Sequence, residues 1–377
     1  MPYSWEDLAG RSLARQFPDV AGRDAAAVAE TVGRIGPIQA QTARSPFLAL
    51  AARMPGVRLE TVSTAYDDLL IVRGSNIRGT VHTSTPEDNA LLEVATRLGQ
   101  RSLWNRTLNL SAKTLEDVWC GIEEYARDEW RTPAALSAHL AAWIAEHDPG
   151  ARPTLANQAG RYFAFGHGGL LRRPLRGGWQ GQGTPGYRSA AALLGDRSHV
   201  LDRADDAMDV LVRRHLTSYG PASRHDLAWW AGVGLRVVDA SLHRLRKELT
   251  EGPGPDGRTY YDVPGTPGPI ELPGVRLLPE FDALLCGYDP KARARFVDAE
   301  HYRRLWFQAN GMLLAPLLLD GRLTGFWRVP GSGLSRPLEV TYFSGTRRPT
   351  KAELVAPVAA LEAAYGITVT SLTVTRE

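Results

Sequence analysis

The chain has 377 residues, of which 44% are hydrophobic and 23% charged, and a formal net charge of +3. This is the composition of a folded globular protein, and the length exceeds the roughly 250 to 300 residues at which one hydrophobic core stops growing. Two or more packed subdomains are therefore expected, and the small basic excess permits a nucleic-acid partner without requiring one.

Neither a membrane span nor a secretory signal is visible. Residues 312–319 form the longest apolar run near the C-terminus, far below the ~20 residues that cross a bilayer. The first 16 residues carry acidic and polar side chains where a signal needs a basic start and an apolar core. We expect a cytoplasmic protein.

Cysteine and lysine are both scarce. Cys120 lies in a predicted helix and Cys286 at a predicted strand end, so we expect small core residues rather than disulfides or a zinc site. Four of the 44 basic residues are lysines, which leaves 44 − 4 = 40 arginines. A Schiff-base lyase needs a desolvated lysine, and none stands beside the best candidate motif described below.

The first predicted unit, residues 1–110, reads as helices at 24–35, 47–54 and 61–69, followed by a hairpin at 69–84. The hairpin is expected to turn at Gly74-Ser75-Asn76. The order of three helices and a hairpin is typical of a winged helix, a variant of the helix-turn-helix DNA-binding unit.

The same order of elements is predicted twice more. In the second unit, residues 111–200, helices at 134–147 and 155–168 precede a strand at 170–177, a Gly-rich turn and a strand from 186. The third, residues 201–268, is the clearest: helices at 202–216, 224–232 and 235–250, with a break at Gly220-Pro221 and a cap at Ser223, lead into a hairpin.

Residues 269–377 change to short apolar runs separated by Gly and Pro, which predict a compact β-rich domain with one helix near its end. Asp320-Gly321 is a strong hairpin signal. The predicted fold class is therefore α+β: three tandem winged-helix units followed by a β-rich C-terminal domain.

Two segments of the first unit carry candidate site residues. Gln39 and Gln41 flank Ala40 in an extended segment, where alternation puts both amides on one side, able to hold a water or a sugar-phosphate. Arg78, Thr80 and His82 alternate along the returning strand and share a face. The alternatives are ordinary loop glutamines and a half-solvated strand.

Basic residues cluster in two further places. Arg172, Arg173 and Arg176 begin a Gly-rich wing suited to follow phosphates or enter a groove, and the third predicted helix of the third unit carries several more. A solvated hairpin, or packing of one unit on another, is the alternative for both. The predicted DNA-binding set is Arg44, Arg172, Arg173, Arg176, Arg244 and Lys247.

Other chemistries lack their motifs. There is no nucleophile elbow, phosphate-binding GK[ST] loop, HExxH or Cys/His metal spacing. We expect neither a metal nor a cofactor.

The segments GPIQAQTARSP, RGTVHTSTPED, LLPEFDALLCGYD, and RFVDAEHY through GMLLAPLLLDGRLTGFW together resemble the AlkZ and YcaQ group of bacterial DNA glycosylases over nearly the whole chain. The resemblance implies that the three winged-helix units form a C-shaped scaffold with a barrel-like C-terminal domain. It also implies that Gln39 and Gln41 are the catalytic pair and that Thr80 and His82, the accompanying T-x-H, support the site. We expect Arg78, on the same strand face, to support it as well. YcaQ-like members have an aspartate at the position of Gln41, so this chain sides with AlkZ.

Members with two glutamines are associated with self-resistance in producers of DNA-alkylating natural products. The resemblance therefore implies substrates with bulky N7-guanine or N3-adenine adducts, including interstrand crosslinks, in double-stranded DNA, and a monomer is the simplest acting form. Because bulky adducts are hard to flip out, we expect a site that stays open at the concave face of the scaffold while the basic hairpin probes a groove.

The chemistry supports this independently. An alkylated cationic purine leaves without a general acid, so the barrier lies in stabilising the oxocarbenium-like sugar and placing water, which amides can do. The scarcity of lysine agrees with a monofunctional enzyme. The alternatives are a non-catalytic winged-helix transcriptional regulator, which predicts sequence-preferring binding and no role for the glutamines, and a protein that sequesters adducts without cutting them.

Overall fold

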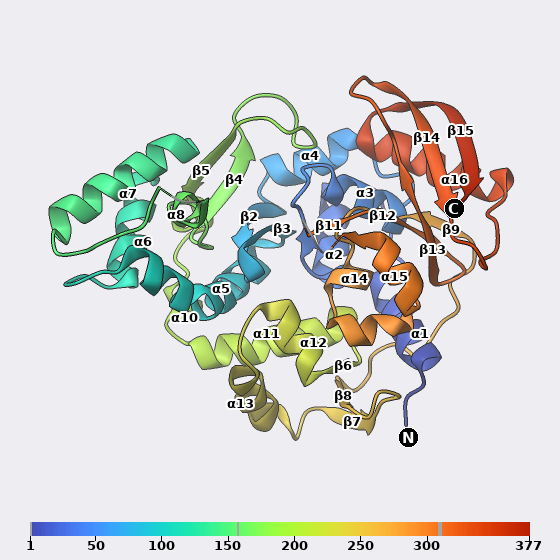
Figure 1. Ribbon diagram of the computed structural model, residues 1–377, viewed down its shortest axis with the longest axis horizontal. Helices are drawn as coiled ribbons and strands as arrows, with labels where there is room; N and C mark the ends of the chain where they lie inside the picture. The colour runs from blue at the N-terminus through green and yellow to red at the C-terminus, as the bar shows by residue number, and fades with distance from the viewer. Residues whose placement is uncertain (1, 157, 308–310) are drawn as a thin grey trace.

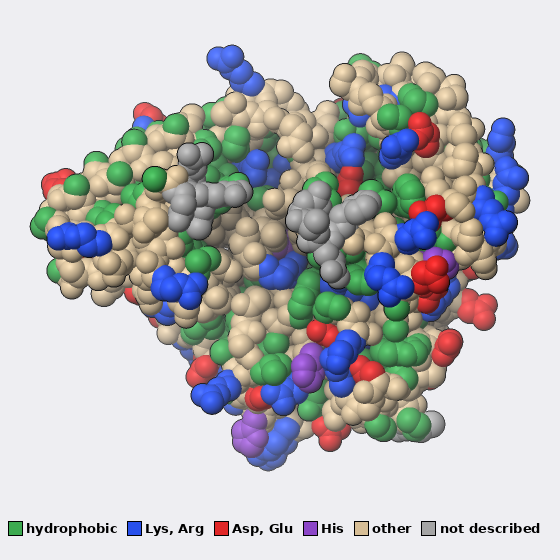
Figure 2. All heavy atoms as spheres, in the orientation of Figure 1, with side chains coloured by type: hydrophobic (Ala, Val, Ile, Leu, Met, Phe, Trp, Pro, Cys, Tyr) green, Lys and Arg blue, Asp and Glu red, His purple; other side chains and the backbone are tan. Residues whose placement is uncertain are grey.

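The computed structural model describes residues 2–156, 158–307 and 311–377, and shows a mixed fold of helices and sheets (Figure 1). Figure 2 shows a central hollow between the lobe that contains α6 (Leu115–Tyr125) and α7 (Pro133–His147) and the C-terminal lobe, with basic side chains in and around it. No helix of the described residues is long and apolar enough to cross a membrane.

The N-terminal part follows the predicted order of helices and a hairpin. Ser4 and Asp24 cap the first two helices by accepting backbone N–H groups of the first turn. The elements are α1 (Trp5–Gln16), α2 (Ala25–Ile35), β1 (Ile38–Gln39), α3 (Ser45–Arg53), α4 (Leu59–Asp67), β2 (Val72–Asn76), the 3-10 turn η1 (Ile77–Gly79) and β3 (Thr80–Ser84).

The hairpin turns three residues later than predicted. Gly74, Ser75 and Asn76 lie inside β2, paired with His82, Val81 and Thr80. The chain reverses at η1 instead, where Arg78 and Gly79 have positive φ angles of 58° and 68°. Composition favours a Gly-Ser-Asn turn, but the left-handed pair that reverses the chain lies at Arg78-Gly79.

The first and second predicted hairpins form one sheet. Its strand order is β1-β3-β2-β4-β5, joined where Gly74 of β2 pairs with Leu171 of β4. The second lobe consists of α6 (Leu115–Tyr125), α7 (Pro133–His147), α8 (Gln158–Phe163), β4 (Leu170–Pro174), β5 (Pro185–Ser189), α9 (Ala190–Leu194) and α10 (Ser198–Leu201). The hairpins of two predicted units are therefore parts of the same five-stranded sheet.

Helix α5 (Pro86–Leu108) connects the two lobes, and no sequence pattern above identifies it. Its first half contributes Leu92 and Ala95 to the central core, whereas Trp104 and Leu108 belong to the core of the second lobe. Because its halves bury residues in different cores, it lacks the single apolar stripe by which a surface helix is recognised.

Residues 202–263 contain the predicted elements of a winged helix. The elements are α11 (Ala204–Tyr219), β6 (Ala222–Ser223), α12 (Arg224–Ala231), α13 (Leu235–Leu245), β7 (Thr250–Pro253) and β8 (Thr259–Asp262), with the sheet order β6-β8-β7. Ser223 caps α12 through a capping box with Asp226. The count of three such units and their boundaries remain predictions.

The C-terminal part is a curled five-stranded sheet that carries α16 (Figure 1). Its strand order is β15-β14-β13-β12-β9, antiparallel except for the β14–β15 pair. Asp320-Gly321 forms the predicted turn. The elements are β9 (Val275–Leu277), α14 (Ala283–Cys286), the 3-10 helix η2 (Pro290–Arg295), α15 (Ala299–Leu305), β10 (Trp306–Phe307), β11 (Met312–Leu313), β12 (Ala315–Leu319), β13 (Arg322–Arg328), β14 (Ser335–Tyr342), α16 (Lys351–Tyr365) and β15 (Thr368–Arg376).

Both cysteine predictions need correction. Cys286 is buried, but in α14 rather than at a strand end, and Cys120 is exposed on α6 rather than part of a core. Neither forms a disulfide.

Candidate active site

The two glutamines follow each other at the edge of the shared sheet but have different environments. β1 pairs Gln39 with His82, and the backbone N–H of Ala40 donates to the carbonyl of Val81 at 2.7 Å. The chain then leaves the sheet, so Gln39 is 8% exposed whereas Gln41 is exposed to solvent. Alternation alone does not predict this difference.

Arg78 fixes the orientation of the Gln39 amide. Its Nη2 donates to Oε1 of Gln39 at 2.9 Å, Nη1 donates to the carbonyl of Trp230, and the guanidinium carbon lies 4.9 Å from the ring centroid of Trp229. Because arginine has no acceptor, the amide oxygen must face it. The NH₂ group of Gln39 is therefore left to donate elsewhere.

The predicted stripe of Arg78, Thr80 and His82 is only partly right, because Arg78 lies in η1 and β3 begins at Thr80. Thr80 holds that turn by donating from Oγ1 to the carbonyl of Ile77 at 3.2 Å. The left-handed conformation of Arg78 is uncommon for a residue with a side chain, and its contacts to Gln39 and Trp230 offset the cost.

His82 is buried and uncharged. Burial, with a smaller effect from the charge of Arg78, lowers its pKa to about 3. Its Nδ1 lies 3.2 Å from the carbonyl of Thr80, so the neutral ring carries its proton there. His82 therefore cannot serve as a general acid at neutral pH.

Gln41 borders a pocket of about 560 Å³ between the first hairpin, α5 and the second lobe. No described residue forms a hydrogen bond with its amide, so its carbonyl and NH₂ are both available. Among the described lining residues there is no aspartate, glutamate or lysine, and five are aromatic: Trp104, Tyr162, Phe163, Phe165 and Tyr187.

Glu280 is a residue that sequence reasoning missed, although it lies in the quoted segment LLPEFDALLCGYD. It pairs with Arg44, and its Oε2 lies 3.4 Å from Oγ1 of Thr42. These contacts hold the loop that follows Gln41. Arg44, predicted to bind DNA, is instead engaged within the protein.

The basic hairpin is anchored near its tip. Arg172 lines the pocket, Arg173 lies over Trp130, and Arg176 is exposed. Trp179 in the Gly-rich loop is buried, stacks on Tyr66 with ring centroids 4.3 Å apart, and donates from Nε1 to Asp67 at 3.0 Å. The loop is therefore not the freely flexible wing that its glycines suggest.

The remaining predicted DNA contacts lie elsewhere. Helix α13 packs on α11 and α12 at the edge of the molecule, away from β3 (Figure 1). Arg244 is partly engaged there, since its Nη2 donates to Asp209 at 2.7 Å, whereas Lys247 is exposed beyond the end of the helix. The structure thus brings together Gln39, Gln41, Arg78, Thr80, His82 and Arg172, but not Arg244 or Lys247.

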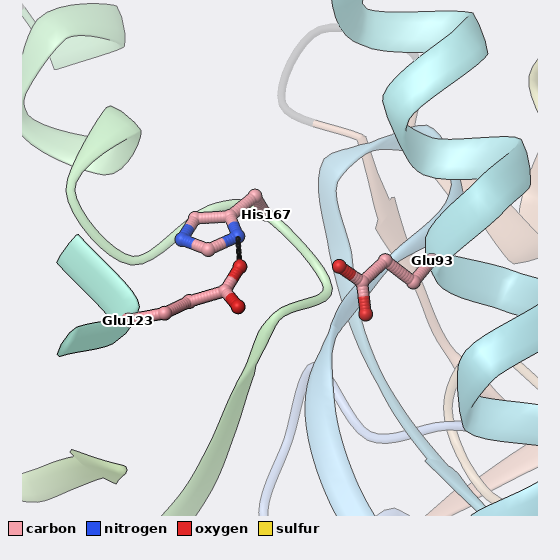
Figure 3. A group of neighbouring side chains, drawn as sticks. All are labelled: Glu93, Glu123 and His167. Atoms are coloured by element: carbon pink, nitrogen blue, oxygen red, sulfur yellow. Dashed lines mark ion pairs between the residues drawn. The ribbon is translucent and has the colours of Figure 1, made fainter. Parts of the chain in front are cut away.

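Glu93, Glu123 and His167 form a second polar cluster that resembles a metal site (Figure 3). His167 Nδ1 lies 3.6 Å from Glu123. However, Arg97 pairs with both carboxylates, and Arg197 pairs with Glu93 at 2.6 Å.

Two guanidiniums therefore compensate two carboxylates, which leaves no net negative charge to attract a cation. Burial and the charges of Arg97 and Arg197 hold the pKa of His167 well below its usual value. We interpret the cluster as an ion-pair network, and the absence of a metal requirement stays a prediction.

The winged-helix element order, the basic central hollow and the amide-bordered pocket define a nucleic-acid-processing protein without a carboxylate or lysine in the described pocket lining. Comparison with known proteins identifies the family. The family model described as DNA glycosylase AlkZ-like matches residues 32–364. The chain belongs to this family and is a DNA glycosylase.

Two similar proteins come from Streptomyces sahachiroi. An interstrand DNA cross-link repair glycosylase is 26% identical, over 93% of this chain and 94% of its own length. The solved structure of the DNA glycosylase AlkZ superimposes with a TM-score of 0.80 at 21% identity, covering 99% of this chain and 100% of that one. The latter similarity shows the fold.

Proposed function

We propose that this DNA glycosylase hydrolyses the N-glycosidic bond of cationic purines alkylated at N7 or N3, with Gln39 and Gln41 as its catalytic pair. The observation that carries the proposal is the amide of Gln41, which forms no hydrogen bond with a described residue and borders a described pocket lining without a carboxylate or lysine. The described lining therefore offers no general acid. A leaving group that is already cationic can depart without one.

The two amides have complementary tasks. The carbonyl of Gln41, which no described residue occupies, accepts a hydrogen bond from the attacking water and faces the positive charge developing on the sugar. Gln39, whose oxygen is held by Arg78, donates from its NH₂ to the oxygen of the same water. The pair thus orients a lone pair of water toward the sugar C1′.

In the reaction, the water oxygen bonds to C1′ as the C1′–N9 bond breaks, and that bond's electron pair neutralises the cationic purine. The water proton passes to solvent. Because no lysine lies in the described lining, we propose that the enzyme stops at the abasic site and acts as a monofunctional glycosylase.

In this proposal, the substrates include purines that carry bulky adducts and purines joined in interstrand crosslinks. The relative that shares 26% of its residues is named for interstrand cross-link repair, and Gln41 is exposed rather than enclosed, as an open site requires. We also propose that the protein acts on double-stranded DNA as a monomer, which sedimentation of the 1:1 complex would test.

Release of base from a duplex with a single N7-methylguanine tests the proposal. Wild type, Gln39→Ala and Gln41→Ala are compared under single turnover at matched folded concentration. We expect release by the wild type, a collapse in either variant with DNA binding retained, and no release of an uncharged hypoxanthine. Sequence-preferring binding without release of this or a bulkier N7 adduct would favour a regulator.

Charge reversal tests the DNA-facing surface. Converting Arg172, Arg173 and Arg176 to glutamate should weaken binding and flatten its dependence on salt, because fewer counterions are released. Lys247→Glu, just beyond the C-terminal end of the distant α13, is the comparison. Unchanged binding and excision in the triple variant would remove the groove-probing role of the hairpin.

A further inference from the structure

The pocket beside Gln41 is larger and more aromatic than a methylated purine site requires. Trp104, Phe163 and Tyr187 are buried members of the second lobe's core that also line the pocket. Phe165 and Tyr162 extend this wall outward, with ring centroids 5.7 Å apart, and Tyr162 is 54% exposed. A volume of about 560 Å³ is in the range that holds drug-sized planar ligands.

The charge of the pocket lining determines which part of a lesion can occupy the pocket. The lining includes the guanidiniums of Arg78 and Arg172, and no carboxylate among its described residues offsets them. A cationic purine placed there meets like charge, whereas a neutral aromatic group stacks on the rings and accepts hydrogen bonds from the arginines. The pocket therefore disfavours the reacting base and favours a neutral ring attached to it.

We propose that this pocket binds a neutral planar aromatic substituent carried by the alkylated purine, while the purine itself remains at Gln41. The inference rests on the proposed function and deepens it by naming the class of adduct. Because the pocket begins at Gln41, a substituent held there places the glycosidic bond against the amide, so binding of the ring contributes to positioning for reaction.

Two duplexes that differ by one ring test this: N7-benzylguanine and N7-methylguanine, both cationic at the purine. One added aromatic stacking contact is worth about tenfold, so we expect wild-type kcat/KM and affinity for the benzyl lesion to exceed those for the methyl lesion by about that factor. Equal values would overturn the proposal.

Leu103 and Leu98 provide a matched pair of variants. Both lie on α5 and both are 37% exposed, but only Leu103 lines the pocket. Leu103→Trp fills the pocket and should lower release and affinity for the benzyl lesion by a larger factor than for the methyl lesion, which abolishes the preference. Leu98→Trp adds the same ring outside the pocket and should preserve it, and Tyr162→Ala should reduce it.

The outcomes separate the two proposals. If Leu103→Trp lowers release and binding of both lesions equally, the purine itself occupies the pocket and the inference is wrong. If neither lesion is released by the wild type, the proposed substrate fails, and the affinities for the benzyl and methyl duplexes then decide on the pocket alone. Loss of benzyl-specific affinity in Leu103→Trp still supports the pocket in that case.

Discussion

The Gln39–Gln41 site and the Glu93–Glu123–His167 cluster contrast in how their polar groups are satisfied. By residue type, the cluster looks more catalytic, since it holds two carboxylates and a histidine within reach of one another. Yet Arg97 and Arg197 pair with its carboxylates, and although Glu123 borders a pocket of about 440 Å³, Glu93 and His167 are buried. Gln41, a neutral residue, has no hydrogen bond to the described chain and borders a pocket.

This difference in hydrogen bonding is the reason for proposing Gln41, rather than the more reactive residue types of the cluster, as the site of the reaction. A Cβ at Gly169 would lie 2.0 Å from Oε1 of Glu123. This glycine therefore allows residues 166–169 to pack closely against the ion pairs. The variants below separate the two regions, one by turnover and the other by stability.

Gln41→Ala should have the largest effect. Removing one preorganised dipole from a reacting site costs about a thousandfold in rate, so single-turnover release from N7-methylguanine should fall by about that factor. The midpoint of urea unfolding should stay unchanged because Gln41 is exposed. A variant that retains wild-type release would remove Gln41 from the mechanism.

Glu93→Gln should give the opposite pattern. The substitution leaves the buried Arg197 without its 2.6 Å partner, and breaking such a pair costs about 3 kcal/mol. The free energy of unfolding, measured in urea, should fall accordingly, while release per folded molecule stays near wild type. A loss of release without a loss of stability would place this cluster in the reaction instead.

Arg78→Lys should have an intermediate effect on the reaction. Lysine keeps the charge but cannot contact Gln39, the carbonyl of Trp230 and the ring of Trp229 at once. We expect kcat to fall about tenfold through a loosely held Gln39, with KM little changed. If Arg78 acts through Gln39, Arg78→Lys combined with Gln39→Ala should be no slower than Gln39→Ala alone. An unchanged kcat per folded molecule in Arg78→Lys would mean that Arg78 only stabilises the fold.

Glu123→Gln should give the smallest effect, visible as a pH trend. Burial, with the charge of Glu93, raises the pKa of Glu123 to about 7. The folded state therefore holds a proton between about pH 4.5 and 7 that the unfolded state has released, and the wild type loses stability as pH rises through this window.

The glutamine variant lacks this loss. Its free energy of unfolding relative to wild type should rise by about 1 to 2 kcal/mol between pH 5.5 and 7.5. Urea titration at each pH measures this change. Glu124→Gln, on the neighbouring exposed carboxylate, is the matched control and should show no such trend. A pH-independent difference in both variants would mean that Glu123 does not hold this proton.

Much of the fold was predictable where the signal is local. The cap at Ser223, the helices of 202–245 and the Asp320-Gly321 turn all depend on residues within a few positions of one another, and each was correctly placed except for the late end assigned to α13. The turn of the β2–β3 hairpin was predicted at residues 74–76 but lies at Arg78-Gly79. Several residues that favour turns stand within a few positions of one another there, so composition alone does not decide which of them form the turn.

The candidate site divides in the same way. The amino-acid sequence by itself placed the two amides in one extended segment and His82 on the returning strand of the hairpin. The pairing of Gln39 in β1 with His82 in β3 is what brings the two segments together. Tertiary structure alone decided that Arg78 contacts the Gln39 amide while Gln41 has no hydrogen bond with a described residue. It also decided that Glu280 contacts the loop between Gln41 and α3, and that α5 contributes side chains to two different cores. Those properties depend on contacts over many tens of residues, for which no local periodicity exists.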